Sequence, residues 1–104
     1  MYAKGFKKPE AKIVIGDNVY LACNVSVITS THEIGPTDKR CGRSVEKDIT
    51  IGNGSWIGCN ATILSGVTIG DGCVIGAGSL VNKDCEPNSL YVGVPAKKVR
   101  SFDE

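Results

Sequence analysis

Residues 49–84 read ITIGNGSWIGCNATILSGVTIGDGCVIGAGSLVNKD, and a branched aliphatic residue returns at every sixth position of this stretch. The same spacing, in the same phase, extends to residues 15–32, IGDNVYLACNVSVITSTH. The first-place residues of these hexads are Ile15, Leu21, Val27, Ile51, Ile57, Ile63, Ile69, Ile75 and Val81. Ile15 and Ile51 are 36 residues apart, which is six whole hexads, so the phase is kept across the stretch between them. A period of six does not match the 3.6-residue period of a helix, and it predicts a different regular repeat.

The other places of the hexad indicate a short strand followed by a tight turn. Seven of the nine fourth-place residues are Gly or Asn, which tolerate a positive φ. The fourth-place residues are Asn18, Asn24, Ser30, Gly54, Asn60, Gly66, Gly72, Gly78 and Asp84. The fifth-place residues are small: Val19, Val25, Thr31, Ser55, Ala61, Val67, Cys73, Ser79 and Cys85. We therefore predict that the aliphatic first-place side chains point inward and that the chain turns at the fourth place.

Hexads of this kind are typical of a parallel β-helix, in which three hexads form one triangular coil and each coil stacks on its neighbour. We predict a single all-β domain over residues 1–104. Its repeat coils cover residues 13–32 and 49–86, an extended loop covers 33–48, and a C-terminal cap covers 87–104. The stretch 33–50 has the length of one further coil and occupies its phase, but it lacks the repeat.

Composition and charge exclude several classes of function. The formal net charge is +1, so bulk electrostatics predict binding neither to nucleic acid nor to an anionic membrane. No apolar run approaches the ~20 residues of a spanning helix, and a cytoplasmic location is the default expectation. The five cysteines include no C-x-x-C pair, and the chain has one histidine. We therefore predict no metal site, and we interpret the cysteines as small apolar residues in a reducing compartment.

Beyond the repeat, several motifs resemble those of the hexapeptide-repeat acyltransferases, most closely the maltose/galactoside O-acetyltransferase group. The motifs are a histidine that ends one coil, the loop after it, W-I-G at 56–58, G-A-G-S at 76–79 and V-G-V-P-A at 92–96. The resemblance covers about residues 12 to 100. It implies a left-handed β-helix, a cyclic homotrimer with active sites between subunits, and acetyl-CoA as co-substrate in the groove between two columns.

The resemblance gives His32 the role of the catalytic base. Acyl transfer from a thioester to a hydroxyl needs a base, donors for the developing oxyanion and a fixed donor position. Imidazole suits the first role because its ordinary pKa lies nearest neutrality. The charged run in 33–50 is explained equally well as a solvated loop or as a wall of a neighbouring subunit's site.

The resemblance also implies contacts to CoA. Cys59 lies where the family meets the pantetheine arm, so its backbone N–H is a candidate oxyanion or thioester contact, and Ala77 is expected to offer backbone hydrogen bonds to the same arm. Trp56 is a candidate for the wall of the site, or else a packing residue. The remaining candidates lie near the nucleotide or its phosphates: Asn82, Lys83, Lys97 and Arg100. For the basic residues, ordinary surface charge is the competing interpretation.

Only 14 residues precede Ile15, whereas close members of the family carry several dozen, including polar groups that bind the acceptor. We therefore expect either a C-terminal fragment or a minimal protein with a rudimentary acceptor site. The leading hypothesis is O-acetylation of a sugar or similar hydroxylated molecule by direct attack, with N-acetylation as a variant. The alternative is a truncated, non-catalytic trimer that binds CoA or serves a structural role. The sequence does not identify the acceptor.

Overall fold

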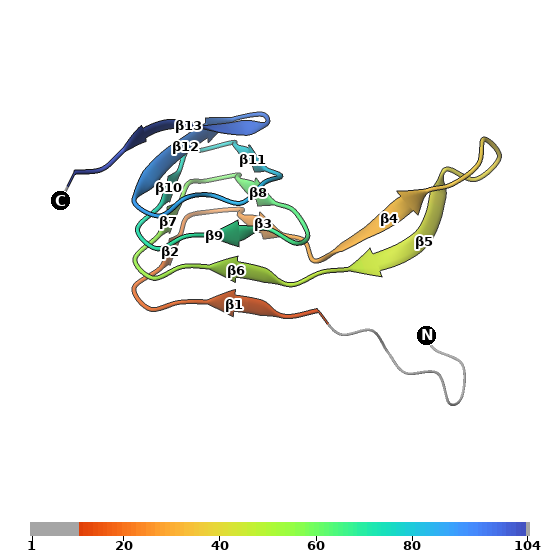
Figure 1. The fold of residues 1–104 in the computed structure, drawn as a ribbon, viewed down its shortest axis with the longest axis horizontal. Coiled ribbons are helices and arrows are strands. Elements are labelled where there is room, and N and C mark those ends of the chain that lie inside the picture. Colours follow the sequence, from red (N-terminus) through yellow and green to blue (C-terminus); the bar gives the residue numbers. More distant parts are fainter. Residues whose placement is uncertain (1–10, 104) are drawn as a thin grey trace.

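The chain winds into a column of stacked three-sided coils with one arm projecting from it (Figure 1). The computed structural model describes residues 11–103. Coil 1 consists of β1 (Ile13–Ile15), β2 (Tyr20–Leu21) and β3 (Ser26–Val27). Coil 2 consists of β6 (Ile49–Ile51), β7 (Trp56–Ile57) and β8 (Thr62–Ile63). Coil 3 consists of β9 (Thr68–Ile69), β10 (Val74–Ile75) and β11 (Leu80–Val81).

The hexad phase sets the register of every coil. Equivalent strands pair in parallel, so that Ile51 lies between Ile15 and Ile69 in one of the three sheets. The step is 36 residues from coil 1 to coil 2 and 18 from coil 2 to coil 3. Because coil 1 pairs directly with coil 2, the stretch 33–50 does not form a coil of its own between them; only its last residues, in β6, lie in the column.

The inward side chains form the core, as the hexad pattern predicts. In coils 2 and 3, the first-place and fifth-place residues are buried: Ile51, Ser55, Ile57, Ala61, Ile63, Val67, Ile69, Cys73, Ile75, Ser79 and Val81. In coil 1 the equivalent Ile15 is 44% exposed, because its strand is hydrogen-bonded on one side only within the described residues. Positive φ occurs at all seven fourth-place Gly and Asn residues and at neither Ser30 nor Asp84, which confirms the predicted turns.

The extended loop is an antiparallel hairpin of β4 (Ser30–Ile34) and β5 (Cys41–Glu46). It leaves the column beside β3 and points away from it (Figure 1). The chain departs at Ser30, two residues before His32, so His32 lies within the arm and not at the end of a coil. The hairpin is held mainly by its own hydrogen bonds and by one exposed ion pair, Arg43 to Glu33 at 2.9 Å.

The C-terminal segment adds one more strand to the column and then folds back. The step shortens from 18 to 16 residues, because Cys85 bridges to Ile69 and Tyr91 pairs with Ile75. Strand β12 (Ser89–Gly93) extends the sheet of β2, β7 and β10, and β13 (Ala96–Ser101) pairs with it in antiparallel fashion. Over residues 11–103, no helix is long and apolar enough to cross a membrane.

Candidate functional site

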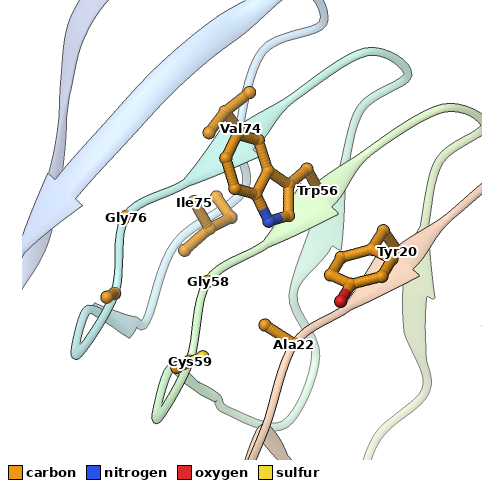
Figure 2. Close-up of a pocket in the computed structure, with 9 residues that line it drawn as sticks. Tyr20, Ala22, Trp56, Gly58, Cys59, Val74, Ile75 and Gly76 are labelled. Atoms are coloured by element: carbon orange, nitrogen blue, oxygen red, sulfur yellow. The ribbon is translucent and has the colours of Figure 1, made fainter.

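A groove of about 400 Å³ lies on the outer face of the sheet that contains β2, β7 and β10 (Figure 2). Its lining comes from equivalent places of three successive coils: Tyr20, Ala22, Trp56, Gly58, Cys59, Val74, Ile75, Gly76 and Ala77. The register stacks these residues in rows, since Trp56 pairs with Tyr20 on one side and with Val74 on the other. The groove is therefore a product of the hexad repeat and needs all three coils.

Aromatic side chains form one wall of the groove. Trp56 and Tyr20 lie side by side on neighbouring strands and are 53% and 65% exposed, respectively (Figure 2). An exposed aromatic pair beside Val74 is an apolar surface suited to an alkyl chain or a flat ring. The floor is bare backbone at the second-place glycines. A Cβ on Gly58 would lie 2.6 Å from the backbone N of Ala77, so only glycine fits there.

Two corners of the column differ in how they use their backbone donors. We call Asp17, Asn53 and Asp71 the Asp corner, and Cys23, Cys59 and Ala77 the Cys corner; each is a stack of third-place residues from coils 1, 2 and 3. Both corners share one interaction between coils, in which the fourth-place N–H donates to the third-place carbonyl of the neighbouring coil at 2.8–2.9 Å. The donor and acceptor pairs are Gly54 to Asp17, Gly72 to Asn53, Asn60 to Cys23 and Gly78 to Cys59.

The third-place N–H groups distinguish the two corners. At the Asp corner, the Asp71 carboxylate accepts from the N–H of Asn53 at 2.7 Å, and the Asn53 side chain accepts from the N–H of Asp17 at 2.8 Å. The Cys corner has no carboxylate or amide side chain in the equivalent places. Within residues 11–103, the backbone N–H groups of Cys59 and Ala77 donate no hydrogen bond to the backbone or side chain of another residue, and both residues line the groove. The Cys corner thus offers two backbone donors to a ligand.

The two thiols of the Cys corner interact. A hydrogen bond between them lowers the pKa of Cys59 and raises the pKa of Cys23. Cys59 is partly buried at the end of the groove, whereas Cys23 is exposed beside it on coil 1. A lowered pKa favours the thiolate form of Cys59.

The predicted CoA contacts and the predicted wall residue Trp56 do not all lie together. Cys59, Ala77 and Trp56 lie together in the groove. Lys97 and Arg100 lie on β13, at the edge of the same sheet.

Arg100 continues the row of side chains that begins with the aromatic wall. Trp56 pairs with Val74, Val74 with Leu90, and Leu90 with Arg100, so all four share one face of the sheet. The Arg100 guanidinium lies over the Phe102 ring at 5.1 Å from its centroid. This row connects an apolar wall to a cation, which suits a ligand that is apolar at one end and anionic at the other.

Asn82 and Lys83 do not join this arrangement. They are exposed and follow β11, whose sheet contains β8 and β3 and not the groove strands. Within one chain, the structure therefore separates them from Cys59 and Ala77.

His32 also lies away from the groove. It is exposed on β4, opposite Ser44 of β5, on the arm that leaves the column beside β3 (Figure 1). The residues that line the groove do not include it. Within the described residues, no group of three or more His, Cys, Asp or Glu side chains is arranged to hold a metal ion.

Six of the nine groove residues were not predicted from the sequence: Tyr20, Ala22, Gly58, Val74, Ile75 and Gly76. The signal was present, because Tyr20 and Val74 share the sixth hexad place with Trp56. Ala22 and Gly76 likewise share the second place with Gly58. Once Trp56 is a candidate, the residues 36 before it and 18 after it are candidates as well.

Comparison with known proteins identifies the repeat. The profile of the family described as bacterial transferase hexapeptide (six repeats) matches residues 48–83. The galactoside O-acetyltransferase of Escherichia coli strain K12 is 44% identical over 92 residues, which are 88% of this chain and 45% of the relative. The chain thus spans about half the length of the curated relatives it matches.

Solved structures agree with the sequence matches. A galactoside acetyltransferase in complex with coenzyme A has a TM-score of 0.82 at 44% identity, over 88% of this chain and 46% of that one. A maltose O-acetyltransferase from Clostridium difficile 630 has a TM-score of 0.81, also at 44% identity, over 88% and 49%. Together with the parallel all-strand column, these matches confirm the expected left-handed parallel β-helix. The chain belongs to the hexapeptide-repeat proteins, and within them it is similar to the galactoside and maltose O-acetyltransferases.

Proposed function

We propose that this chain binds acetyl-CoA in the groove and transfers its acetyl group to a hydroxyl of a sugar or similar small molecule. The observation that carries the proposal is the pair of free backbone donors, those of Cys59 and Ala77, at the end of an apolar groove. A relative that is 44% identical is a galactoside O-acetyltransferase, and a solved structure of such an enzyme holds coenzyme A.

The groove fits the chemistry of the pantetheine arm, which alternates alkyl segments with amides. Trp56 and Tyr20 supply apolar surface for the alkyl segments, and the free N–H groups can donate to carbonyl oxygens. Lys97 and Arg100 on β13 are cations for the phosphates, and the Arg100 guanidinium can bind them in bidentate fashion.

The proposed site needs more than one copy of the chain. The arm that carries His32 in β4 projects from one side of the column, whereas the groove lies on another sheet. A homotrimer in which the arm of one copy reaches the groove of the next would bring the two together. Light scattering on the purified protein should then give about three times the 10.9 kDa chain mass, and a strictly monomeric protein would contradict the shared site.

In the proposed reaction, His32 accepts the proton of the acceptor hydroxyl as the oxygen attacks the thioester carbonyl. The N–H of Cys59 donates to the oxyanion that develops on that carbonyl. His32 then returns its proton as the carbon–sulfur bond breaks and the CoA thiol leaves. No acyl-enzyme is required, because the acceptor attacks directly.

The activity test follows thiol release from acetyl-CoA with a panel of sugars. Replacing His32 by alanine should lower the turnover by about 10²–10⁴-fold, because a general base contributes on that scale, and leave CoA affinity unchanged. Replacing the solvent-exposed Asp38 in the turn of the arm by alanine is the matched control and should keep full activity. Thiol release that is equally fast in both variants would remove His32 from the mechanism.

A non-catalytic module that binds CoA or serves a structural role is the second candidate, favoured by the position of His32 outside the groove of its own chain. CoA binding without turnover on any hydroxyl acceptor would support it. Turnover on amino sugars alone would indicate N-acetylation. A cytoplasmic location also stays a prediction.

A further inference from the structure

The Cys corner places two thiols next to each other on neighbouring coils. Leu21 pairs with Ile57, and Cys23 and Cys59 each follow these partners by two residues. The coils stay paired at this point, because the N–H of Asn60 donates to the carbonyl of Cys23 at 2.9 Å. Adjacent strands of a sheet lie about 4.8 Å apart. A disulfide needs a Cα separation of about 4.4–6.8 Å, so the stacking of the coils already provides it.

The two thiols are suited to different steps of thiol–disulfide exchange. The lowered pKa of Cys59 makes it the better thiolate, and the raised pKa of Cys23 keeps that thiol protonated while Cys59 reacts. Cys59 is reached through the groove, and Cys23 is exposed beside it. One thiol can therefore attack a small disulfide, and the other lies within reach of the product.

We propose that Cys23 and Cys59 form a dithiol site that is oxidised to an intramolecular disulfide by low-molecular-weight disulfides. The Cys59 thiolate attacks one sulfur of the small disulfide, forms a mixed disulfide and releases the first small thiolate. Cys23 then loses its proton and attacks the sulfur of Cys59. The mixed disulfide breaks, and the second small thiolate leaves. Two cysteines are oxidised, one small disulfide is reduced to two thiols, and the two cysteine protons end on them.

The other three cysteines provide internal controls. Cys73 and Cys85 are buried, and burial raises the pKa of Cys85 to about 12, so neither is expected to react in the folded protein. Cys41 is exposed on β5, where it pairs with Ile34. A mixed disulfide on Cys41 therefore has no stacked thiol to resolve it and is expected to persist.

The site does not depend on the proposed function, but one consequence of it does. Cys59 lines the groove, so a bond from its sulfur to coil 1 would change the end of the groove that is proposed to receive the acetyl-bearing arm. The oxidised protein is then expected to bind CoA at least several-fold more weakly than the reduced protein.

The test treats the folded protein with glutathione disulfide, blocks the remaining thiols with N-ethylmaleimide and maps the products by mass spectrometry. The expected product has a Cys23–Cys59 disulfide without glutathione, and a retained glutathione on Cys41. Replacing Cys23 by serine or by alanine should leave a stable glutathione adduct on Cys59, whereas replacing Cys41 by serine should not affect the disulfide. A lasting adduct on Cys59 in the wild type, or reaction at Cys41 alone, would overturn the proposal. Titration of the reduced and the oxidised protein with CoA then tests only the predicted loss of CoA affinity.

Discussion

The Asp corner and the Cys corner are built from the same hexad places. At the Asp corner, side chains accept hydrogen bonds from the third-place N–H groups, whereas at the Cys corner the N–H groups of Cys59 and Ala77 are free to bind a ligand. Both corners turn through a positive-φ Gly or Asn, and both pass the same fourth-place hydrogen bond from coil to coil. They differ at the third place: Asn53 and Asp71 present oxygen acceptors to the N–H groups of Asp17 and Asn53, whereas Ala77 presents none to the N–H of Cys59. In this fold, a binding surface arises where the repeat omits a side chain that would otherwise satisfy the backbone.

Among the changes that test this comparison, the largest expected effect comes from converting the Cys corner into a copy of the Asp corner. In the Ala77→Asp variant, the new carboxylate should accept from the N–H of Cys59, as Asp71 accepts from Asn53 at 2.7 Å. Losing one such donor to a ligand corresponds to about 1.4–2.8 kcal/mol, or about tenfold to a hundredfold in affinity. Isothermal titration with CoA measures the change.

Two controls separate loss of the donor from loss of space. Ala77→Ser adds a side chain too short to reach the N–H of Cys59 in the same way and should bind CoA nearly as the wild type does. Asp71→Ala frees the N–H of Asn53 at the Asp corner and should leave CoA affinity unchanged. Equal losses in all three variants would show that the free donors do not select the ligand.

The next expected effect is on the free energy of unfolding, and it arises at the buried residue that follows the Asp corner. The buried Ser55 hydroxyl donates to the carbonyl of Gly70 at 3.0 Å and accepts from the N–H of Cys73 at 3.1 Å. At the Cys corner, the equivalent residue is the buried Ala61. Ser55→Ala should leave the buried N–H of Cys73 without an acceptor and lower the free energy of unfolding by about 1–3 kcal/mol in urea titration.

The matched control for this prediction is Ala61→Ser. It introduces a hydroxyl in the same place of the other corner, where the N–H of Ser79 already donates to Gly76 at 3.3 Å. This variant should gain no stability. If Ser55→Ala unfolds at the wild-type urea concentration, the serine hydroxyl is not needed at the Asp corner.

The smallest expected effect concerns the thiol of Cys59. Its pKa is lowered chiefly by the hydrogen bond with Cys23, so Cys23→Ala should raise the pKa of Cys59. Because only the thiolate reacts, alkylation of Cys59 by iodoacetamide should then require a higher pH than in the wild type. Peptide mapping of the alkylated protein over a pH series measures the shift. Cys41→Ala serves as the control and should leave the profile of Cys59 in place, whereas an unchanged profile in Cys23→Ala would contradict the coupling.

Much of the column could be predicted because the hexad rule is local. The Gly and Asn residues at the fourth place fix the turns, and the first-place aliphatic residues need only a neighbouring coil to be buried. The arm could not be delimited in this way. The arm leaves the column at Ser30 because Ser30 pairs with Glu46 and His32 with Ser44 in antiparallel fashion. The hexad repeat does not predict this pairing. The shortening of the step between coil 3 and β12 from 18 to 16 residues could not be predicted either, because it follows from the pairing of Val74 with Leu90.

By itself, the sequence determined the coil, its turns and the corner at which each third-place residue lies, because a six-residue period fixes position along a three-sided column. Only the tertiary structure decided what each position became. Ile15 and Ile51 share a hexad place, but Ile15 is 44% exposed and Ile51 is fully buried, because burial depends on having a coil on both sides. The tertiary structure also decided the groove and its free donors. A backbone N–H is free for a ligand only where the side chain stacked against it on the next coil accepts no hydrogen bond from it.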